Sequence, residues 1–203
     1  MTDIAKAVGP KTMIMPVLNG MRHLDALIAR FGETPVLGGV CLVASTIDLE
    51  GRINACRTMH QGAPALDFES KELLALTVYV ARQSKGLPID ISDNPATARF
   101  VDAGRSIFER RQGQLNLSCA QCHDDNWGQK LAGATIPQGH PNGYPVYRLE
   151  WQGLGSLQRR LRNCLFGMRA ETYAYGAPEL NELELFLAWR ARDLLIETPA
   201  VRP

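Results

Sequence analysis

Two cysteines and a histidine stand together in the segment Cys-Ala-Gln-Cys-His at residues 119–123. Two thiols separated by two residues can add across the two vinyl groups of a haem, and the imidazole that follows can bind the iron from the proximal side. The sequence therefore predicts one covalently attached haem c, held by Cys119 and Cys122, with His123 as an iron ligand. Two alternatives stay open at this point: a structural zinc site that adds Cys164, and a redox-active cysteine pair.

The ligand on the other side of the iron decides what such a haem can do. The candidates downstream of the motif are His140, Cys164 and Met168. Either His140 or Met168 would make an ordinary electron carrier. Cys164 would instead supply a thiolate, a strong donor that lowers the haem potential.

Arginines gather immediately before Cys164, in the segment Gln-Arg-Arg-Leu-Arg-Asn-Cys at residues 158–164. Arg160 lies four residues before Cys164, and residues at this spacing share one face of a helix. Positive charge beside a thiol lowers its pKa and attracts anions, which makes Cys164 and Arg160 candidate catalytic residues. The spacing alone equally allows a buried, inert Cys164 beside a solvated face of arginines.

These residues must be positioned by helices, because no stretch of the chain shows the two-residue alternation of a strand. We expect an all-α fold with long irregular loops, the main loop covering residues 128–147. Gly104 would let its helix cross the C-terminal helix closely, with Phe108 packed near the haem and Phe186 and Trp189 on the partner helix. The expected helices span residues 21–31, 45–57, 68–84, 97–111, 157–165 and 180–195.

Self-comparison indicates a duplicated unit. When Cys56 is set against Cys164, Leu49 falls on Leu157 and Arg52 on Arg160. The same offset places residues 11–15 opposite the haem motif, but they read Lys-Thr-Met-Ile-Met. We therefore predict an N-terminal segment at 1–34, a degenerate, haem-free cytochrome c-like domain at 35–95 and a haem-binding domain at 96–203.

Composition sets outer limits on function. The 203-residue chain is 45% hydrophobic and 21% charged, which is ordinary for a globular protein. Its net charge of +1 selects neither nucleic acid nor an anionic membrane as partner. No run of about 18 apolar residues predicts a membrane span. Residues 8–18 do not form a secretory signal, since Pro10, Lys11 and Pro16 interrupt them.

The half of the chain from residue 102 to 203 closely resembles the C-terminal haem domain of the SoxA family, the larger cytochrome subunit of the thiosulfate-oxidising SoxAX complex. Residues 47–88 resemble the end of that family's N-terminal cytochrome domain. The segments that carry the resemblance in the C-terminal half are 119–123, 147–157, 159–164, 169–171, 175–180, 187–190 and 201–203.

The resemblance implies a tandem cytochrome c fold in which some members have lost the first haem. It implies that Cys164 is a distal haem ligand, found as a persulfide, and that Arg160 binds substrate. The implied activity is that of an L-cysteine S-thiosulfotransferase: thiosulfate is joined oxidatively to a cysteine of the SoxYZ carrier, and electrons pass through haem to the small cytochrome SoxX. A non-catalytic electron-transfer cytochrome and a haem-free interaction subunit remain the alternatives.

Two expectations concern the front of the chain. The family implies a periplasmic location, because bacteria attach haem c outside the cytoplasm. The missing export signal therefore suggests that the start is misassigned or truncated, or that the front half of this copy is defective. Family members without the first haem also suggest a disulfide in its place, which here would join Cys41 and Cys56.

Overall fold

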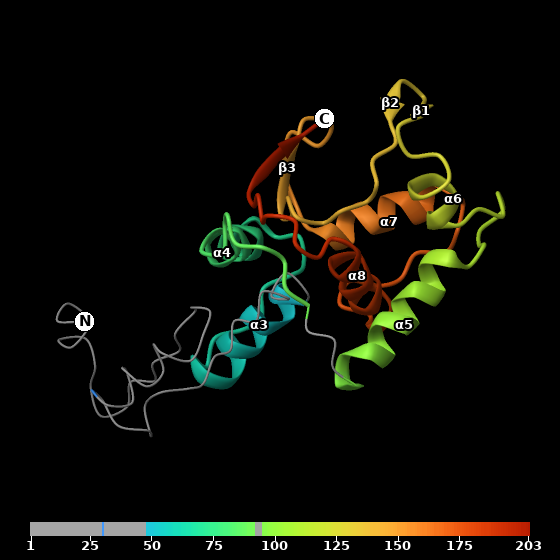
Figure 1. Ribbon diagram of the computed structural model, residues 1–203. Coiled ribbons are helices and arrows are strands. Elements are labelled where there is room, and N and C mark those ends of the chain that lie inside the picture. Colours follow the sequence, from blue (N-terminus) through green and yellow to red (C-terminus); the bar gives the residue numbers. More distant parts are fainter. Residues whose placement is uncertain (1–29, 31–47, 92–94) are drawn as a thin grey trace. The chain divides into compact units, whose positions relative to one another are not determined.

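The computed structural model describes Arg30, residues 48–91 and residues 95–203, and Figure 1 shows how their elements follow one another. All of these residues except Arg30 belong to one compact unit, residues 43–203. The helix expected at 21–31 lies outside the described residues apart from Arg30, and so does Cys41. Within the described part of the chain, no helix has the length and apolar character needed to cross a membrane.

Six helices are present among the described residues, and each expected helix of that region is confirmed. The C-terminal helix ends earlier than predicted because the chain after it turns back to pair with residues 87–89. There the Ile89 N–H donates to the Leu194 carbonyl and the Ile196 N–H to the Leu87 carbonyl, both at 2.9 Å. The helices are α3 (Leu49–His60), α4 (Lys71–Arg82), α5 (Pro95–Glu109), α6 (Cys119–His123), α7 (Leu157–Gly167) and α8 (Pro178–Arg190).

The expectation of an all-α class holds only in part, because the described residues also form two small sheets. The main sheet has the order β4-β3-β5, with β3 antiparallel to β4 and parallel to β5. Strands of two or three residues are too short to show a two-residue alternation, which explains why the pattern missed them. The strands are β1 (Lys130–Leu131), β2 (Ala134–Thr135), β3 (Val146–Arg148), β4 (Gly153–Gly155) and β5 (Ala200–Arg202).

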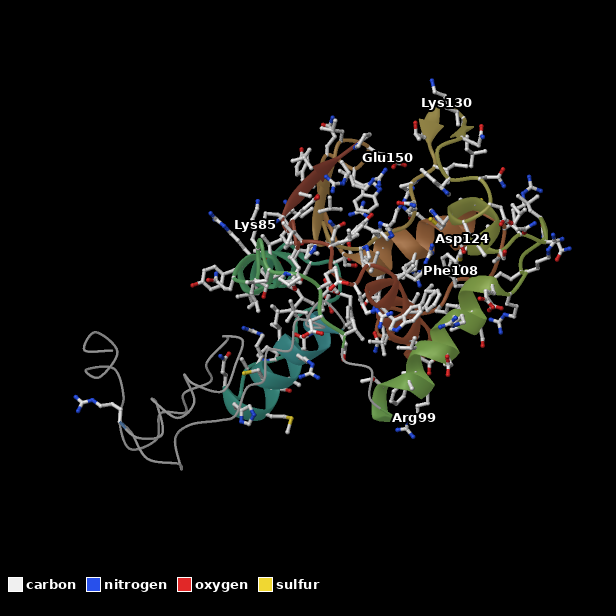
Figure 2. All side chains as sticks on the ribbon, in the orientation of Figure 1. Lys85, Arg99, Phe108, Asp124, Lys130 and Glu150 are labelled. Atoms are coloured by element: carbon white, nitrogen blue, oxygen red, sulfur yellow. The ribbon has the colours of Figure 1, made fainter. Side chains whose placement is uncertain are left out.

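The region expected to be an irregular loop, residues 128–147, contains the β1–β2 hairpin. Its turn residues Ala132 and Gly133 have φ values of 48° and 85°. Positive φ at both central residues is what a two-residue hairpin turn with the strand twist requires. Lys130 lies in this hairpin, away from α5 and α8 in the view of Figure 2.

Helices α5 and α8 cross closely, as the sequence predicts. A Cβ atom on Gly104 would come within 2.8 Å of the Phe186 Cβ and would also clash with the Glu182 carbonyl of α8. Only glycine allows this approach. Phe108, which is 2% exposed, packs beside the crossing with its ring centroid 5.3 Å from that of Phe186.

The two copies of the sequence repeat lie on corresponding helices. Leu49 begins α3 and Leu157 begins α7, so Cys56 and Cys164 occupy the same position in each helix. Cys56 is half-buried and has no disulfide partner among the described cysteines. Because Cys41 lies outside that set, its pairing with Cys56 stays a prediction.

Candidate haem and anion site

The short helix α6 carries the Cys-Ala-Gln-Cys-His motif and is fixed at its start by a capping box. The Ser118 hydroxyl accepts from the Gln121 N–H at 3.3 Å, and the Gln121 side chain accepts from the Ser118 N–H at 2.9 Å. Two donors that a helix start leaves unpaired are thereby satisfied. This capping box was not predicted, although Ser-x-x-Gln at a helix start is a recognisable sequence signal.

His123 is oriented by the loop that follows α6. Its Nδ1 lies 2.6 Å from the Pro137 carbonyl oxygen. A carbonyl can only accept, so Nδ1 carries the proton and Nε2 presents its lone pair for a metal. Gly139 packs against the same ring: a Cβ there would lie 3.3 Å from the His123 Cγ. Burial is the main cause that lowers the pKa of His123, which further favours the neutral ligand form.

An aromatic and cationic wall lies beside this histidine. The Phe108 ring centroid is 6.5 Å from that of His123, and the Arg190 guanidinium sits 4.4 Å from the Phe108 centroid. Arg190 also pairs with Asp124, the residue after His123. Figure 2 shows Phe108 and Asp124 near one another at the α6 end of α5. Helices α5, α6 and α8 are thus joined around one side of the motif.

The structure brings Cys164 close to the two motif cysteines. The pKa of Cys119 is raised to about 12, mainly by burial and in smaller part by the charges of Cys164 and Cys122. Burial also raises the pKa of Cys164, while Arg160 opposes this and Cys122 adds to it. The expectation that arginines depress the pKa of Cys164 is therefore wrong in net effect, because burial outweighs them. Burial thus favours the protonated form of the Cys164 thiol.

Of the three arginines before Cys164, only Arg160 faces it. Arg159 lies 3.7 Å from Glu69, and the Arg162 guanidinium lies 4.5 Å over the Tyr175 ring. A second arginine, Arg148 on β3, also lowers the pKa of Cys164 through its charge. This residue was not among the predicted site residues. No sequence pattern could have linked it to Cys164, because a strand of the sheet and helix α7 meet only in the fold.

Glu150 completes the charged group around Cys164. Its Oε2 lies 3.3 Å from Arg148 Nη2 and 4.0 Å from Arg160 Nη1. A hydrogen bond from Arg148 also acts on Tyr144, although burial, the larger effect, raises the pKa of that tyrosine. Two cations and one carboxylate therefore surround a half-buried thiol beside the haem motif.

The other two candidate ligands occupy different settings. Met168 is the C-cap of α7, only 8% exposed, and its carbonyl accepts from the Leu115 N–H at 3.4 Å. His140 is half-buried in the loop after the hairpin, and burial is the main cause that lowers its pKa. Neither residue belongs to the charged group that Arg148, Arg160 and Glu150 form near Cys164.

The donors of this site fit haem c. Two half-buried thiols stand on one short helix, and the neighbouring imidazole has its Nε2 lone pair free because Nδ1 is used by Pro137. Within residues 48–91 and 95–203, no group of three or more His, Cys, Asp and Glu side chains is arranged to hold a metal ion by itself. A haem iron needs no such group, since the macrocycle supplies four of its ligands.

Comparison with known proteins agrees with this chemistry. The family model for the SoxA/TsdA cytochrome c domain matches residues 43–89 and 103–196, more than half of the chain. The L-cysteine S-thiosulfotransferase subunit SoxA of Pseudaminobacter salicylatoxidans is 38% identical over 158 residues, covering 77% of this chain and 55% of the relative. The same subunit of Rhodovulum sulfidophilum is 38% identical over 185 residues, covering 91% of this chain and 61% of the relative.

A solved structure has the same fold. The crystal structure of SoxXA from P. pantotrophus contains a chain that is 33% identical, with a TM-score of 0.75 over 76% of this chain and 59% of that one. The present chain therefore spans little more than half the length of the relatives it matches. Its fold is cytochrome c-like, with a haem c attachment motif on α6. By sequence and by structure, the chain belongs to the SoxA/TsdA cytochrome c domain family.

Proposed function

We propose that this chain is the catalytic cytochrome subunit of an L-cysteine S-thiosulfotransferase. Thiosulfate is joined to a cysteine of a SoxYZ-like carrier: a new S–S bond forms, the carrier thiol gives up its proton, and two electrons leave. Written out, carrier–SH and S₂O₃²⁻ give carrier–S–S–SO₃⁻, one H⁺ and two electrons. The names of the relatives support this assignment.

One observation carries the proposal: Cys164 and Arg160 share a face of α7 beside the motif cysteines. The Cys164 sulfur is a soft group that can accept and pass on a sulfur species once it carries an additional sulfur atom. Arg160, whose side chain is 31% exposed, remains accessible to a dianion and can bind it through charge-assisted hydrogen bonds. Arg160 would thus hold the anion beside the Cys164 sulfur, which can accept a sulfur species and pass it on.

One haem c per chain completes the site, with Cys119 and Cys122 as its anchors and His123 and Cys164 as iron ligands. Bound haem c would accept electrons one at a time, so the two released electrons would leave in two successive one-electron transfers. A SoxX-like small cytochrome takes these electrons onward, which is consistent with the SoxXA composition of the matched structure. Attachment of haem c places the mature protein in the periplasm.

The first half of the chain is a cytochrome c-like domain without haem in this proposal. The boundaries remain 35–95 for that domain and 96–203 for the haem domain, after the segment 1–34. The corresponding positions of Cys56 on α3 and Cys164 on α7 support the duplication. Ile89 and Ile91 of the first part pack into the main core, which would stabilise the join between the two.

The test is transfer of thiosulfate to a carrier protein, followed by intact mass spectrometry of the carrier. Arg160→Ala should keep the haem spectrum and lose roughly ten- to a hundredfold in kcat/KM, because one charge-assisted anion contact contributes about 1.5–3 kcal/mol. Arg160→Lys should restore only part of the loss, since it lacks the planar fork. Arg162→Ala is the matched control, because Arg162 lies on the same helix but over Tyr175.

An Arg160→Ala protein with unchanged kcat/KM would contradict the proposal. The electron-carrier alternative would gain if the wild-type protein exchanged electrons with a small cytochrome but left the carrier mass unchanged. Both results can be measured without a structure of the complex.

A further inference from the structure

The carboxylate of Glu150 stands between the two arginines nearest Cys164. The same oxygen, Oε2, is 3.3 Å from Arg148 Nη2 and 4.0 Å from Arg160 Nη1. Because one oxygen approaches both guanidinium groups, the three side chains form one charged cluster, and Arg160 lies one helical turn before Cys164 on α7. Glu150 therefore occupies the position that an external anion would need in order to meet both guanidinium groups.

Arg148 is built into this site more firmly than Arg160. Its side chain is 14% exposed, against 31% for Arg160, and its guanidinium lies 5.3 Å over the Trp151 ring. Its strand β3 is paired on both sides, by β4 and by β5. The Nε of Arg148 is buried and has no hydrogen-bond partner among the residues that the structure describes. A buried guanidinium N–H without a partner costs free energy, which an anion at this position would recover.

The side chain of Glu150, in contrast, can move away from the two arginines. Its side chain is 57% exposed and lies in the turn between β3 and β4, outside both strands. An ion pair this exposed is weak, typically 0–1 kcal/mol. Figure 2 shows Glu150 in this part of the molecule, beside the end of β3. Displacing its carboxylate costs little and leaves it in water.

The net charge of the group indicates which class of anion it binds most favourably. Arg148 and Arg160 carry two positive charges, and Glu150 cancels one of them. A dianion that replaces Glu150 makes the group neutral, whereas a dianion that binds beside Glu150 leaves an uncompensated negative charge. Since exchanging the carboxylate for a monoanion changes nothing in this balance, the site favours dianions.

We propose that Arg148 is a second substrate-binding residue beside Arg160, and that Glu150 is an internal anion which thiosulfate must displace. This inference rests on the proposed function and assigns two further residues to its site. Arg148 determines specificity for a dianion, and Glu150 sets the affinity by competing with it. Neutralising Glu150 should therefore tighten anion binding, which is the opposite of what removal of an ordinary structural ion pair does.

The experiment measures affinity for thiosulfate, and for unreactive sulfate, by calorimetry on the oxidised haem-loaded full chain without carrier protein. Glu150→Gln should bind both anions about two- to fivefold more tightly, the range that corresponds to losing an exposed ion pair. Arg148→Ala should weaken binding about ten- to a hundredfold with an unchanged haem absorption spectrum. Glu72→Gln and Arg82→Ala, both exposed on α4, change the net charge equally and should leave affinity unaltered.

The outcomes separate this inference from the proposed function. If Arg160→Ala weakens binding but Glu150→Gln does not tighten it, the inference is wrong and the proposed function stands. If Arg148→Ala shifts the haem spectrum and leaves anion affinity unchanged, Arg148 serves the haem and the inference is again wrong. If neither arginine affects affinity, or no variant binds either anion, the anion site of the proposed function fails as well.

Discussion

Glu184 offers a sharp test of how the first part of the chain is joined to the haem domain. It lies on α8, is 4% exposed, and its Oε2 accepts from the Asp48 N–H at 3.4 Å, just before α3. Burial is the main cause that raises its pKa to about 8, and the charges of Glu50 and Asp48 contribute. Glu50 is 6% exposed, its Oε1 has no hydrogen-bond partner within the described part of the chain, and burial is the main cause that raises its pKa to about 7.

The pKa of Glu184 determines how its contribution to the free energy of unfolding changes with pH. A carboxyl whose pKa is higher in the folded than in the unfolded chain binds its proton more tightly when folded. Glu184 therefore imposes no penalty below about pH 4.5, and the free energy of unfolding falls as the pH rises toward 8. Each pH unit in that range costs about 1.4 kcal/mol for one such group. Between pH 5 and 7, Glu184 should cost the protein roughly 3 kcal/mol.

Glu184→Gln removes this titration and keeps both size and a hydrogen-bond acceptor for the Asp48 N–H. We expect the variant to be about as stable as wild type at pH 5 and more stable by roughly 3 kcal/mol at pH 7. The assay is urea unfolding of the haem-loaded protein, followed by circular dichroism, at pH 5, 6 and 7. Glu72→Gln, at an exposed position of α4, is the control and should follow wild type. A stability difference between Glu184→Gln and wild type that stays constant with pH would refute the reasoning.

Three further predictions follow from the site. Gly104→Ala should destabilise the protein by about 1–3 kcal/mol in urea unfolding, because its Cβ would meet the Phe186 Cβ at 2.8 Å where α5 and α8 cross. Cys119→Ser combined with Cys122→Ser should abolish covalent haem in intact mass spectrometry, whereas a mass with two haems on the wild-type chain would contradict the single-haem proposal. Cys164→Met should raise the haem potential, since a thioether donates less charge than a thiolate; an unchanged low-spin electron paramagnetic resonance signal would mean that Cys164 is not an iron ligand.

Local signals in the sequence were enough to locate five of the six helices in the described part of the chain, all except the short α6. Helices α4 and α7 start after Ser70 and Ser156, whose hydroxyls accept backbone N–H groups, and Gly86 with φ of 84° follows the end of α4. The strands escaped prediction because they depend on partners far along the chain. Strand β3 exists only because residues 153–155 and 200–202 pair with it.

The haem attachment motif and the close helix crossing could both be predicted from the sequence alone. The spacing of Cys119, Cys122 and His123 is short-range, so it can be read without a fold, and Gly104 marks a place where no side chain fits. The sequence also placed Arg160 on the same helix face as Cys164, because that relation spans a single turn.

The set of charges around Cys164, in contrast, depends on how the chain folds. Arg148 and Glu150 come from β3 and the turn after it, whereas Arg160 comes from α7, and Arg159 and Arg162 turn to other partners. Burial reversed the expected sign of the pKa shift at Cys164. Electrostatic energies depend on distance and solvent exposure in three dimensions, and sequence spacing gives neither beyond one turn of a helix.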